Sequence, residues 1–153
     1  MNKVESGVNS TLVFSSTKAY LFFVAYLCFM YLLYLNTDFL KTEIVSGKNL
    51  MNQYGFLESI LLIALIGSII EEFLFRYVLF KLLAPFNDLM ILTLSSTLWA
   101  VLHFSENLLV PIMLFFLGWI LGVLRIQTNS IMHSILVHFL NNAIFIFFLR
   151  VII

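Results

Sequence analysis

Residues 60–80 read ILLIALIGSIIEEFLFRYVLF, an apolar stretch that contains three charged residues, Glu71, Glu72 and Arg76. About 20 predominantly apolar residues are enough to cross a bilayer as a helix. An ionisable group within such a span costs about 2.5–3.5 kcal/mol on insertion scales, so it marks a candidate functional site. This stretch therefore indicates both the environment of the chain and the place where its chemistry is to be sought.

The composition of the whole chain agrees with a membrane environment. Of the 153 residues, 62% are hydrophobic and 10% are charged, whereas soluble domains have about 25% charged residues. The mean hydropathy is +1.06. So few charges cannot cover a soluble fold of this size, and so apolar a chain is not disordered. The formal net charge is zero and Lys and Arg do not cluster, so we expect no nucleic-acid partner.

Five apolar runs are expected to form membrane helices: Ala19–Leu35, Phe56–Leu83, Leu89–His103, Leu108–Leu124 and Ile131–Leu149. Strands are excluded because the runs are long and do not alternate. We therefore expect an all-α, polytopic helix bundle, multi-pass in the cell membrane. It divides into a polar N-terminal lead (1–17), a first helix with the loop Asn36–Tyr54 (18–54), and a core (55–153).

The charges of the second run form a pattern. Glu72 and Arg76 are four residues apart with the acid first, which favours a buried ion pair on one helix face. Glu71 points about 100° away and has no charge partner on its own helix. A carboxylate desolvated inside a bundle is a better proton acceptor near neutrality than an exposed one. The alternative is that all three charges only hold helices together.

Two histidines supply the rest of the candidate site. His103 closes the third run, one turn after Trp99, and His138 lies within the fifth run, one turn before Asn142. At about 1.5 Å per residue in an up-down bundle, these groups and Glu71 fall in one layer about 7 Å deep. The sequence therefore predicts one shared polar site inside the bundle.

This set of groups favours activation of water. Glu71 can take a proton, His103 can orient the water, and an oxyanion can be stabilised by two donors, His138 and Asn142. The predicted reaction is hydrolysis of an amide bond. The single cysteine, Cys28, lies in an apolar run and is expected to be a small buried hydrophobe.

Three motifs, each on its own apolar run, resemble in order and spacing those of the CPBP family: Glu71-Glu72-x-x-x-Arg76, Trp99-x-x-x-His103 and His138-x-x-x-Asn142. These are the CAAX-processing and bacteriocin-processing membrane proteases, also called the Abi family, which includes the Rce1-type prenyl-protein endopeptidases. The resemblance covers about Leu57 to Ile153.

The resemblance implies an intramembrane endopeptidase of the glutamate type. It assigns activation of water to Glu71 and His103, the oxyanion site to His138 and Asn142, and support of the site to Glu72 and Arg76. It implies no cofactor, and its partners are membrane lipids and a peptide or membrane-protein substrate. Zinc is an alternative, because the family was once considered zinc-dependent, although the sequence contains no HExxH.

The sequence departs from the family pattern at two motifs and in length. Trp99 stands where the second motif usually begins with Phe, and Asn141 adjoins Asn142. Full family members carry more helices, so a second copy in a homo-oligomer would supply a missing wall of the substrate chamber.

Two other functions compete with a protease. One is a non-catalytic family member that acts as a bacteriocin-immunity or membrane scaffold protein. The other is a haem-binding or ion-binding bundle that uses His103, His133 and His138, which is disfavoured because His133 lies roughly 14 Å from His103 in depth. His133 is expected to make an interhelical hydrogen bond, and Gly118-x-x-x-Gly122 predicts close helix packing.

Overall fold

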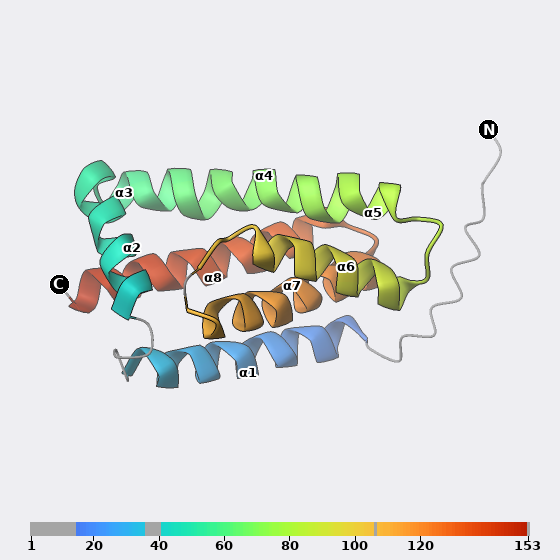
Figure 1. The fold of residues 1–153 in the computed structure, drawn as a ribbon, viewed down its shortest axis with the longest axis horizontal. Coiled ribbons are helices and arrows are strands. Elements are labelled where there is room, and N and C mark those ends of the chain that lie inside the picture. Colours follow the sequence, from blue (N-terminus) through green and yellow to red (C-terminus); the bar gives the residue numbers. More distant parts are fainter. Residues whose placement is uncertain (1–14, 36–40, 106, 153) are drawn as a thin grey trace.

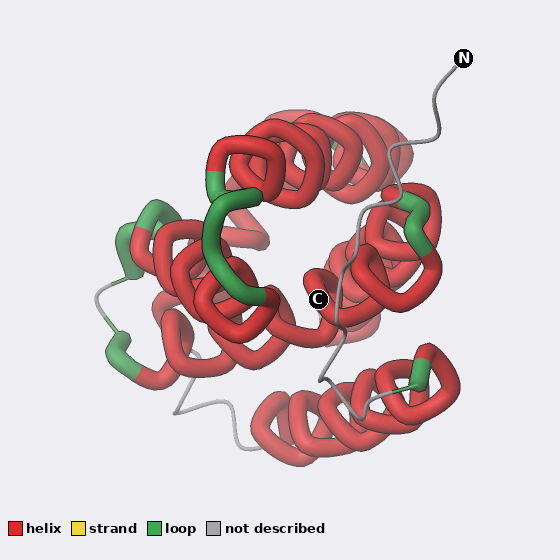
Figure 2. Tube along the Cα trace, turned by 90° about the vertical axis from the view of Figure 1, so that its right-hand side faces the viewer, coloured by secondary structure: helices red, strands yellow, loops and turns green. Residues whose placement is uncertain are grey.

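The computed structural model describes residues 15–35, 41–105 and 107–152, in which all regular structure is helical. Most of the predicted N-terminal lead lies outside the described residues. The long helices lie side by side, with α1 at one edge of the bundle (Figures 1 and 2). The predicted all-α helix bundle is therefore confirmed.

The helices follow one another in this order: α1 (Ser16–Leu35), α2 (Lys41–Tyr54), α3 (Phe56–Ser59), η1 (Ile60–Gly67), α4 (Ser68–Glu72), η2 (Phe73–Val78), α5 (Leu79–Leu82), α6 (Asp88–Val101), α7 (Leu109–Thr128) and α8 (Ile131–Ile152). Helices α1, α7 and α8 are long and apolar enough to cross a membrane, and α6 is a shorter apolar helix. The elements α3 to α5 form one helical path with two π-helical stretches, η1 and η2. Such stretches are frequent at functional sites.

The predicted loop Asn36–Tyr54 is wrong over most of its length, because Lys41–Tyr54 form helix α2. Its polar residues suggested a loop, but Ile44 and Met51 lie two turns apart on one face. Both are buried in a cluster with side chains of α1 and α8. Gly47 lies between them, and a Cβ there would be 2.5 Å from Leu149 Cδ1 of α8. An amphipathic face and a close approach to α8 thus account for this helix.

Two predicted helix ends also differ from the structure. Helix α6 ends at Val101, so His103 lies in the following turn rather than in the helix. Helix α7 continues beyond the predicted end at Leu124 and stops at Thr128. Its C-cap is Asn129, with φ 49°, a left-handed conformation that Asn tolerates. Polar residues after Leu124 therefore extend this helix instead of ending it.

Helices α6 and α7 are in close contact through the two glycines of the predicted packing motif. A Cβ on Gly118 would lie 3.0 Å from Trp99 Cε3 of α6 and 3.1 Å from Arg76 Nη2. A Cβ on Gly122 would lie 2.5 Å from Leu92 Cδ2. The prediction of close packing is confirmed, and the contact also includes Arg76, the one charged residue of η2.

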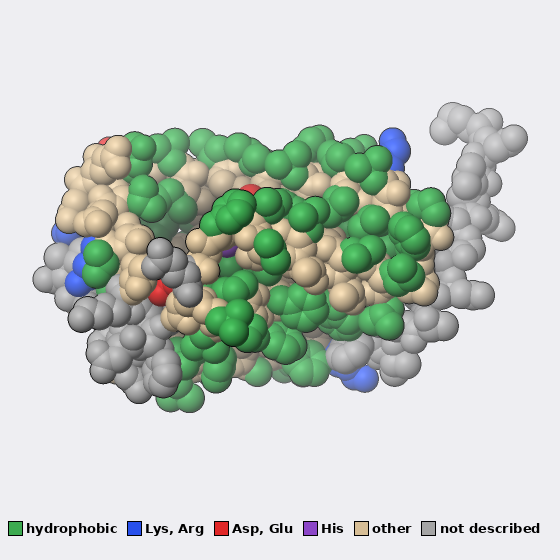
Figure 3. Space-filling view, in the orientation of Figure 1, with side chains coloured by type: hydrophobic (Ala, Val, Ile, Leu, Met, Phe, Trp, Pro, Cys, Tyr) green, Lys and Arg blue, Asp and Glu red, His purple; other side chains and the backbone are tan. Residues whose placement is uncertain are grey.

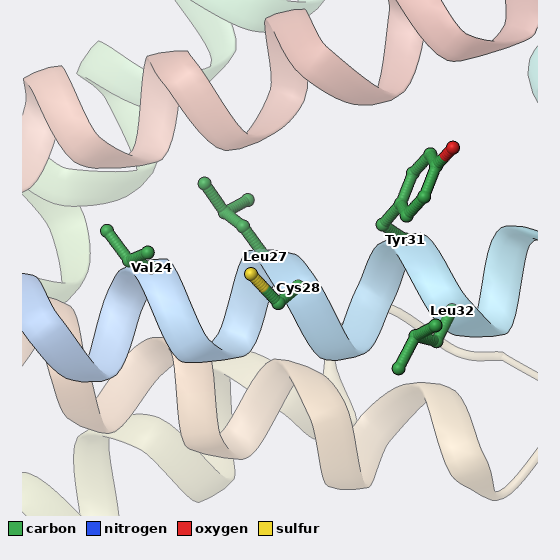
Figure 4. Close-up of a pocket in the computed structure, with 5 residues that line it drawn as sticks. All are labelled: Val24, Leu27, Cys28, Tyr31 and Leu32. Carbon is green, nitrogen blue, oxygen red and sulfur yellow. The ribbon is translucent and has the colours of Figure 1, made fainter.

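Helix α1 packs on the bundle along one face, which contains Ala19, Phe23, Met30 and Tyr34. These residues are spaced by four or seven positions, and Cys28 lies on the opposite face. Cys28 is exposed, so the expectation of a buried cysteine is wrong. Together with four neighbours on α1 it lines a shallow apolar pocket on the outer surface (Figure 4).

The outer surface is that of a protein in lipid. Hydrophobic side chains are spread along the whole face drawn in Figure 3, whereas Lys and Arg are visible only at its left end and towards its right end. Many of the exposed large side chains are Leu, Ile and Phe of the long helices. Lipid chains can solvate such side chains, whereas water cannot. The chain is a membrane protein.

We expect Gly118→Ala to destabilise the fold by about 1–3 kcal/mol, because the added methyl group would overpack the contact between α6, α7 and η2. The measurement is thermal unfolding in detergent micelles. The matched control is Gly67→Ala, where the added Cβ meets only Leu62 O at 3.6 Å and replacing a helical glycine favours the helix. Equal stability of the two variants would contradict the proposed role of close packing at Gly118.

Candidate active site

The site is centred on the carboxylate of Glu71, at the point where three helical segments meet. Glu71 lies on α4 between the two π-helical stretches. Its Oε2 atom accepts a hydrogen bond of 2.6 Å from Trp99 Nε1. The same oxygen lies 3.8 Å from His103 Nε2 and 3.9 Å from His138 Nε2. The structure thus brings together three of the four residues that the sequence places in one polar layer.

The three groups differ in exposure. The side chains of Glu71 and His103 are 32% and 35% exposed, whereas that of His138 is 3% exposed. Acidic and histidine side chains are also visible where the surface is hollowed beside α6 (Figure 3). The site is therefore open on the side of His103 and closed by protein behind His138.

His103 is oriented by the end of α6. Its backbone N–H donates a hydrogen bond to Ala100 O, at 3.3 Å. The carbonyl oxygen of Trp99, which that N–H would bond in a continuing helix, instead lies 2.8 Å from His103 Nδ1. A carbonyl only accepts hydrogen bonds, so Nδ1 carries the proton. In the neutral ring, Nε2 then presents a lone pair towards Glu71.

His138 is oriented by the second glutamate of the motif. Its Nδ1 lies 2.9 Å from Glu72 Oε1, a fully buried atom pair on α8 and α4. The carboxylate accepts this hydrogen bond, which aims Nε2 at Glu71. The resemblance implied a supporting role for Glu72, and the structure shows the contact through which it can act.

Arg76 is completely buried, and several groups compensate its charge. Its Nε atom lies 3.5 Å from Glu72 Oε2, so the predicted buried ion pair is confirmed. Its Nη2 donates a hydrogen bond of 3.0 Å to Gly118 O on α7. The guanidinium carbon lies 5.0 Å from the centre of the Trp99 ring, within the range of a cation–π contact. Arg76 thus links η2 to α6 and α7.

Asn142 lies on the α4 side of α8. Its Nδ2 donates to Ser68 Oγ at 3.3 Å, and its Oδ1 accepts from Asn141 Nδ2 at 3.2 Å. Ser68 begins α4, one turn before Glu71. Among the described residues, the hydrogen bonds of Asn142 therefore go to Ser68 and Asn141. Its role as an oxyanion donor stays a prediction.

Two contacts of the site did not follow from the sequence. The sequence identified Trp99 only as the aromatic residue of a motif, and the structure adds the hydrogen bond from its indole to Glu71. Ser68, the partner of Asn142, carried no signal except its position one turn before Glu71. Both contacts join different helices, so neither follows from spacing along one helix.

The spacing of the acidic and histidine side chains bears on whether the site could hold a metal ion. Among the described residues, no group of three or more His, Cys, Asp and Glu side chains is arranged to hold a metal ion. Glu71 Oε2 is 3.8 and 3.9 Å from the two Nε2 atoms, whereas ligand atoms of a tetrahedral zinc site lie about 3.3 Å apart. The absence of a cofactor stays a prediction.

His133 lies apart from the site, in the first turn of α8. Its Nδ1 atom is buried and has no hydrogen-bond partner in the described part of the chain. The expected interhelical hydrogen bond is therefore not made through this atom.

Fold and site together define a helical membrane protein with a carboxylate–histidine cluster inside its bundle. A family model described as type II CAAX prenyl endopeptidase, Rce1-like, matches residues 53–144. The chain belongs to this family, which confirms the resemblance expected from the three motifs. The matched residues include the whole cluster and leave α1 outside. No curated protein and no solved structure matches the chain.

We expect Arg76→Leu to lower the free energy of unfolding by about 3–5 kcal/mol, because it leaves the buried charge of Glu72 without its partner. The measurement is denaturant-induced unfolding in micelles. The double variant Glu72→Gln, Arg76→Leu removes both charges but keeps an oxygen that can accept from His138 Nδ1, so it should recover part of the loss. A double variant less stable than Arg76→Leu would contradict this account of the pair.

Proposed function

We propose that the protein is a multi-pass endopeptidase of the cell membrane that hydrolyses a peptide bond with a water molecule activated by Glu71 and His103. The observation that supports this best is the convergence of two imidazole Nε2 atoms on Glu71 Oε2, at 3.8 and 3.9 Å. These distances are too long for direct hydrogen bonds. They suit one water molecule at about 2.8 Å from each of two neighbouring groups.

The first step of the proposed reaction is the attack of this water. Glu71 accepts one proton of the water, and His103 Nε2 accepts a hydrogen bond from the other, because the proton of the neutral ring is on Nδ1. The oxygen of the water then forms a bond to the carbonyl carbon of the substrate. Two acceptors therefore orient the lone pair of the water towards the peptide bond.

His138 is proposed to stabilise the oxyanion that forms in this step. Its Nδ1 already donates to Glu72, so Nε2 can donate only when the ring is protonated. The site contains two carboxylates, Glu71 and Glu72, but among the described residues Arg76 pairs only with Glu72, so an imidazolium at His138 would balance the negative charge of Glu71. A charged donor in a site shielded from water stabilises an oxyanion strongly.

Asn142 is proposed as the second donor. Its amide is bound to the hydroxyl of Ser68, a weak acceptor that a developing oxyanion can replace. Collapse of the intermediate breaks the C–N bond, and Glu71 returns its proton to the leaving nitrogen. The reaction then balances, with one water consumed and a carboxylic acid and an amine released.

The substrate is proposed to be a membrane-embedded or membrane-proximal peptide segment. The cluster lies between apolar helices, and its exposed side is that of His103. The matched family is described as a type II CAAX prenyl endopeptidase, so a prenylated CAAX peptide is the first probe. Membrane lipids are the other proposed partner. We also propose that a second copy of the chain forms one wall of the substrate chamber.

We expect Glu71→Gln to abolish cleavage of a fluorogenic farnesylated CAAX peptide in liposomes, because the amide cannot take the proton of the water. The matched control is Glu58→Gln on α3, an exposed carboxylate. The control should cleave at the wild-type rate. An unmodified peptide of the same sequence shows whether the prenyl group is needed.

Two results would contradict the proposed protease. One is undiminished cleavage by Glu71→Gln, and the other is a folded wild-type protein that cleaves neither peptide nor any other segment of a membrane-anchored library. The second result, together with protection of cells against a bacteriocin that persists in Glu71→Gln, would favour the immunity or scaffold function.

We expect cleavage by the purified protein to persist in a chelator such as 1,10-phenanthroline, because the proposed base and donors are side chains. The measurement compares initial rates with and without the chelator, and with zinc added back. An inactive chelator analogue, 1,7-phenanthroline, is the control. Loss of activity with the chelator alone, restored by zinc, would assign a metal to this site.

A further inference from the structure

We propose that Trp99 is a positioning residue that sets the geometry of both water-activating groups, through its indole N–H for Glu71 and through its backbone carbonyl for His103. This inference rests on the proposed function. Phenylalanine, which usually begins this motif, has no N–H group and cannot make the hydrogen bond that Trp99 makes to Glu71.

The side chain of Trp99 contacts four charged or titratable groups of the site, Glu71, His103, His138 and Arg76. Nε1 donates to Glu71 Oε2 at 2.6 Å. The ring lies edge-on to His103 and His138, with centres 4.9 and 5.3 Å apart. The guanidinium of Arg76 lies over it at 5.0 Å. One side chain thus touches four helical segments or turns at once.

The indole is held rigidly. Trp99 is 1% exposed, and the backbone of Gly118 approaches its ring so closely that a Cβ would be 3.0 Å from Cε3. The indole nitrogen is only a donor, and a buried donor without an acceptor costs free energy. The carboxylate of Glu71 therefore accepts a hydrogen bond from an indole N–H that is fixed by the packing of its ring.

This hydrogen bond is compatible with the role of Glu71 as a base. A carboxylate oxygen has two lone pairs, so Oε2 can accept from the indole and still face the water. The carbonyl of the same residue binds His103 Nδ1 at 2.8 Å. A displacement of Trp99 would therefore move both acceptors of the water, and small misplacements of catalytic groups reduce rates strongly.

The proposal is tested in a Trp119→Phe background. The sequence contains two tryptophans, so this background leaves Trp99 alone. Trp119→Phe alone also serves as the matched control, because it makes the same chemical change on another helix, α7. Two changes are then made at position 99. Trp99→Phe removes the N–H and part of the ring, and 3-benzothienylalanine keeps the shape of the indole but replaces its N–H by sulfur.

The first measurement is the NMR resonance of the ¹⁵N-labelled indole of Trp99 in nanodiscs. We expect a low-field indole proton that moves to higher field in Glu71→Gln, because a neutral amide accepts more weakly than a carboxylate. A merely structural tryptophan would not respond to this change. A resonance identical in the two proteins would overturn the proposed hydrogen bond.

The second measurement is cleavage of the farnesylated CAAX peptide. We expect both changes at position 99 to reduce kcat about tenfold or more, as for loss of a hydrogen bond to a charged group, with KM unchanged. Wild-type kcat in the benzothienylalanine protein would overturn the positioning role. Activity in Glu71→Gln, with the indole shift observed, would overturn the proposed function and leave the hydrogen bond established.

Discussion

The buried ion pair between Glu72 and Arg76 is the interaction on which the site depends. A charge within an apolar bundle is stable only when it is paired and hydrogen-bonded. Arg76 is paired with Glu72, donates to the carbonyl of Gly118 and lies over the ring of Trp99, while its Nε and Nη1 atoms make no hydrogen bond within the described residues. Glu72 meets the condition through Arg76 and His138. The same contacts that compensate these charges also orient the histidine and the tryptophan that face Glu71.

Two adjacent glutamates have different roles in this arrangement: Glu72 supports the site, and Glu71 is the proposed reactive group. Glu72 points into the protein and is fully buried, whereas Glu71 is partly exposed and faces the open side. Neighbouring helical residues point about 100° apart, so one turn of helix supplies both a structural and a reactive carboxylate. The π-helical stretches on either side, η1 and η2, place this turn within an irregular part of the path.

The sequence predicted which polar residues lie close together better than it predicted the connections between helices. Helical rise alone predicts one layer for Glu71, His103 and His138, and in the structure the Nε2 atoms of both histidines lie within 4 Å of Glu71 Oε2. Helix α2 was missed because its composition is polar and its burial depends on contacts with α1 and α8. The turn at His103 was missed because an apolar run continues through it, while the chain leaves the helix at Val101.

The sequence by itself determined the membrane environment, the helical class, the ion pair within one helix and the family to which the three motifs point. These properties depend on composition and on spacing along single helices, which the order of residues specifies directly. Only the tertiary structure decided which atoms meet across helices: the indole of Trp99 on Glu71, His138 on Glu72 and Asn142 on Ser68. The physical reason is that the rotation of each helix about its axis depends on packing, here on the close approach at Gly118, and spacing along the chain does not specify it.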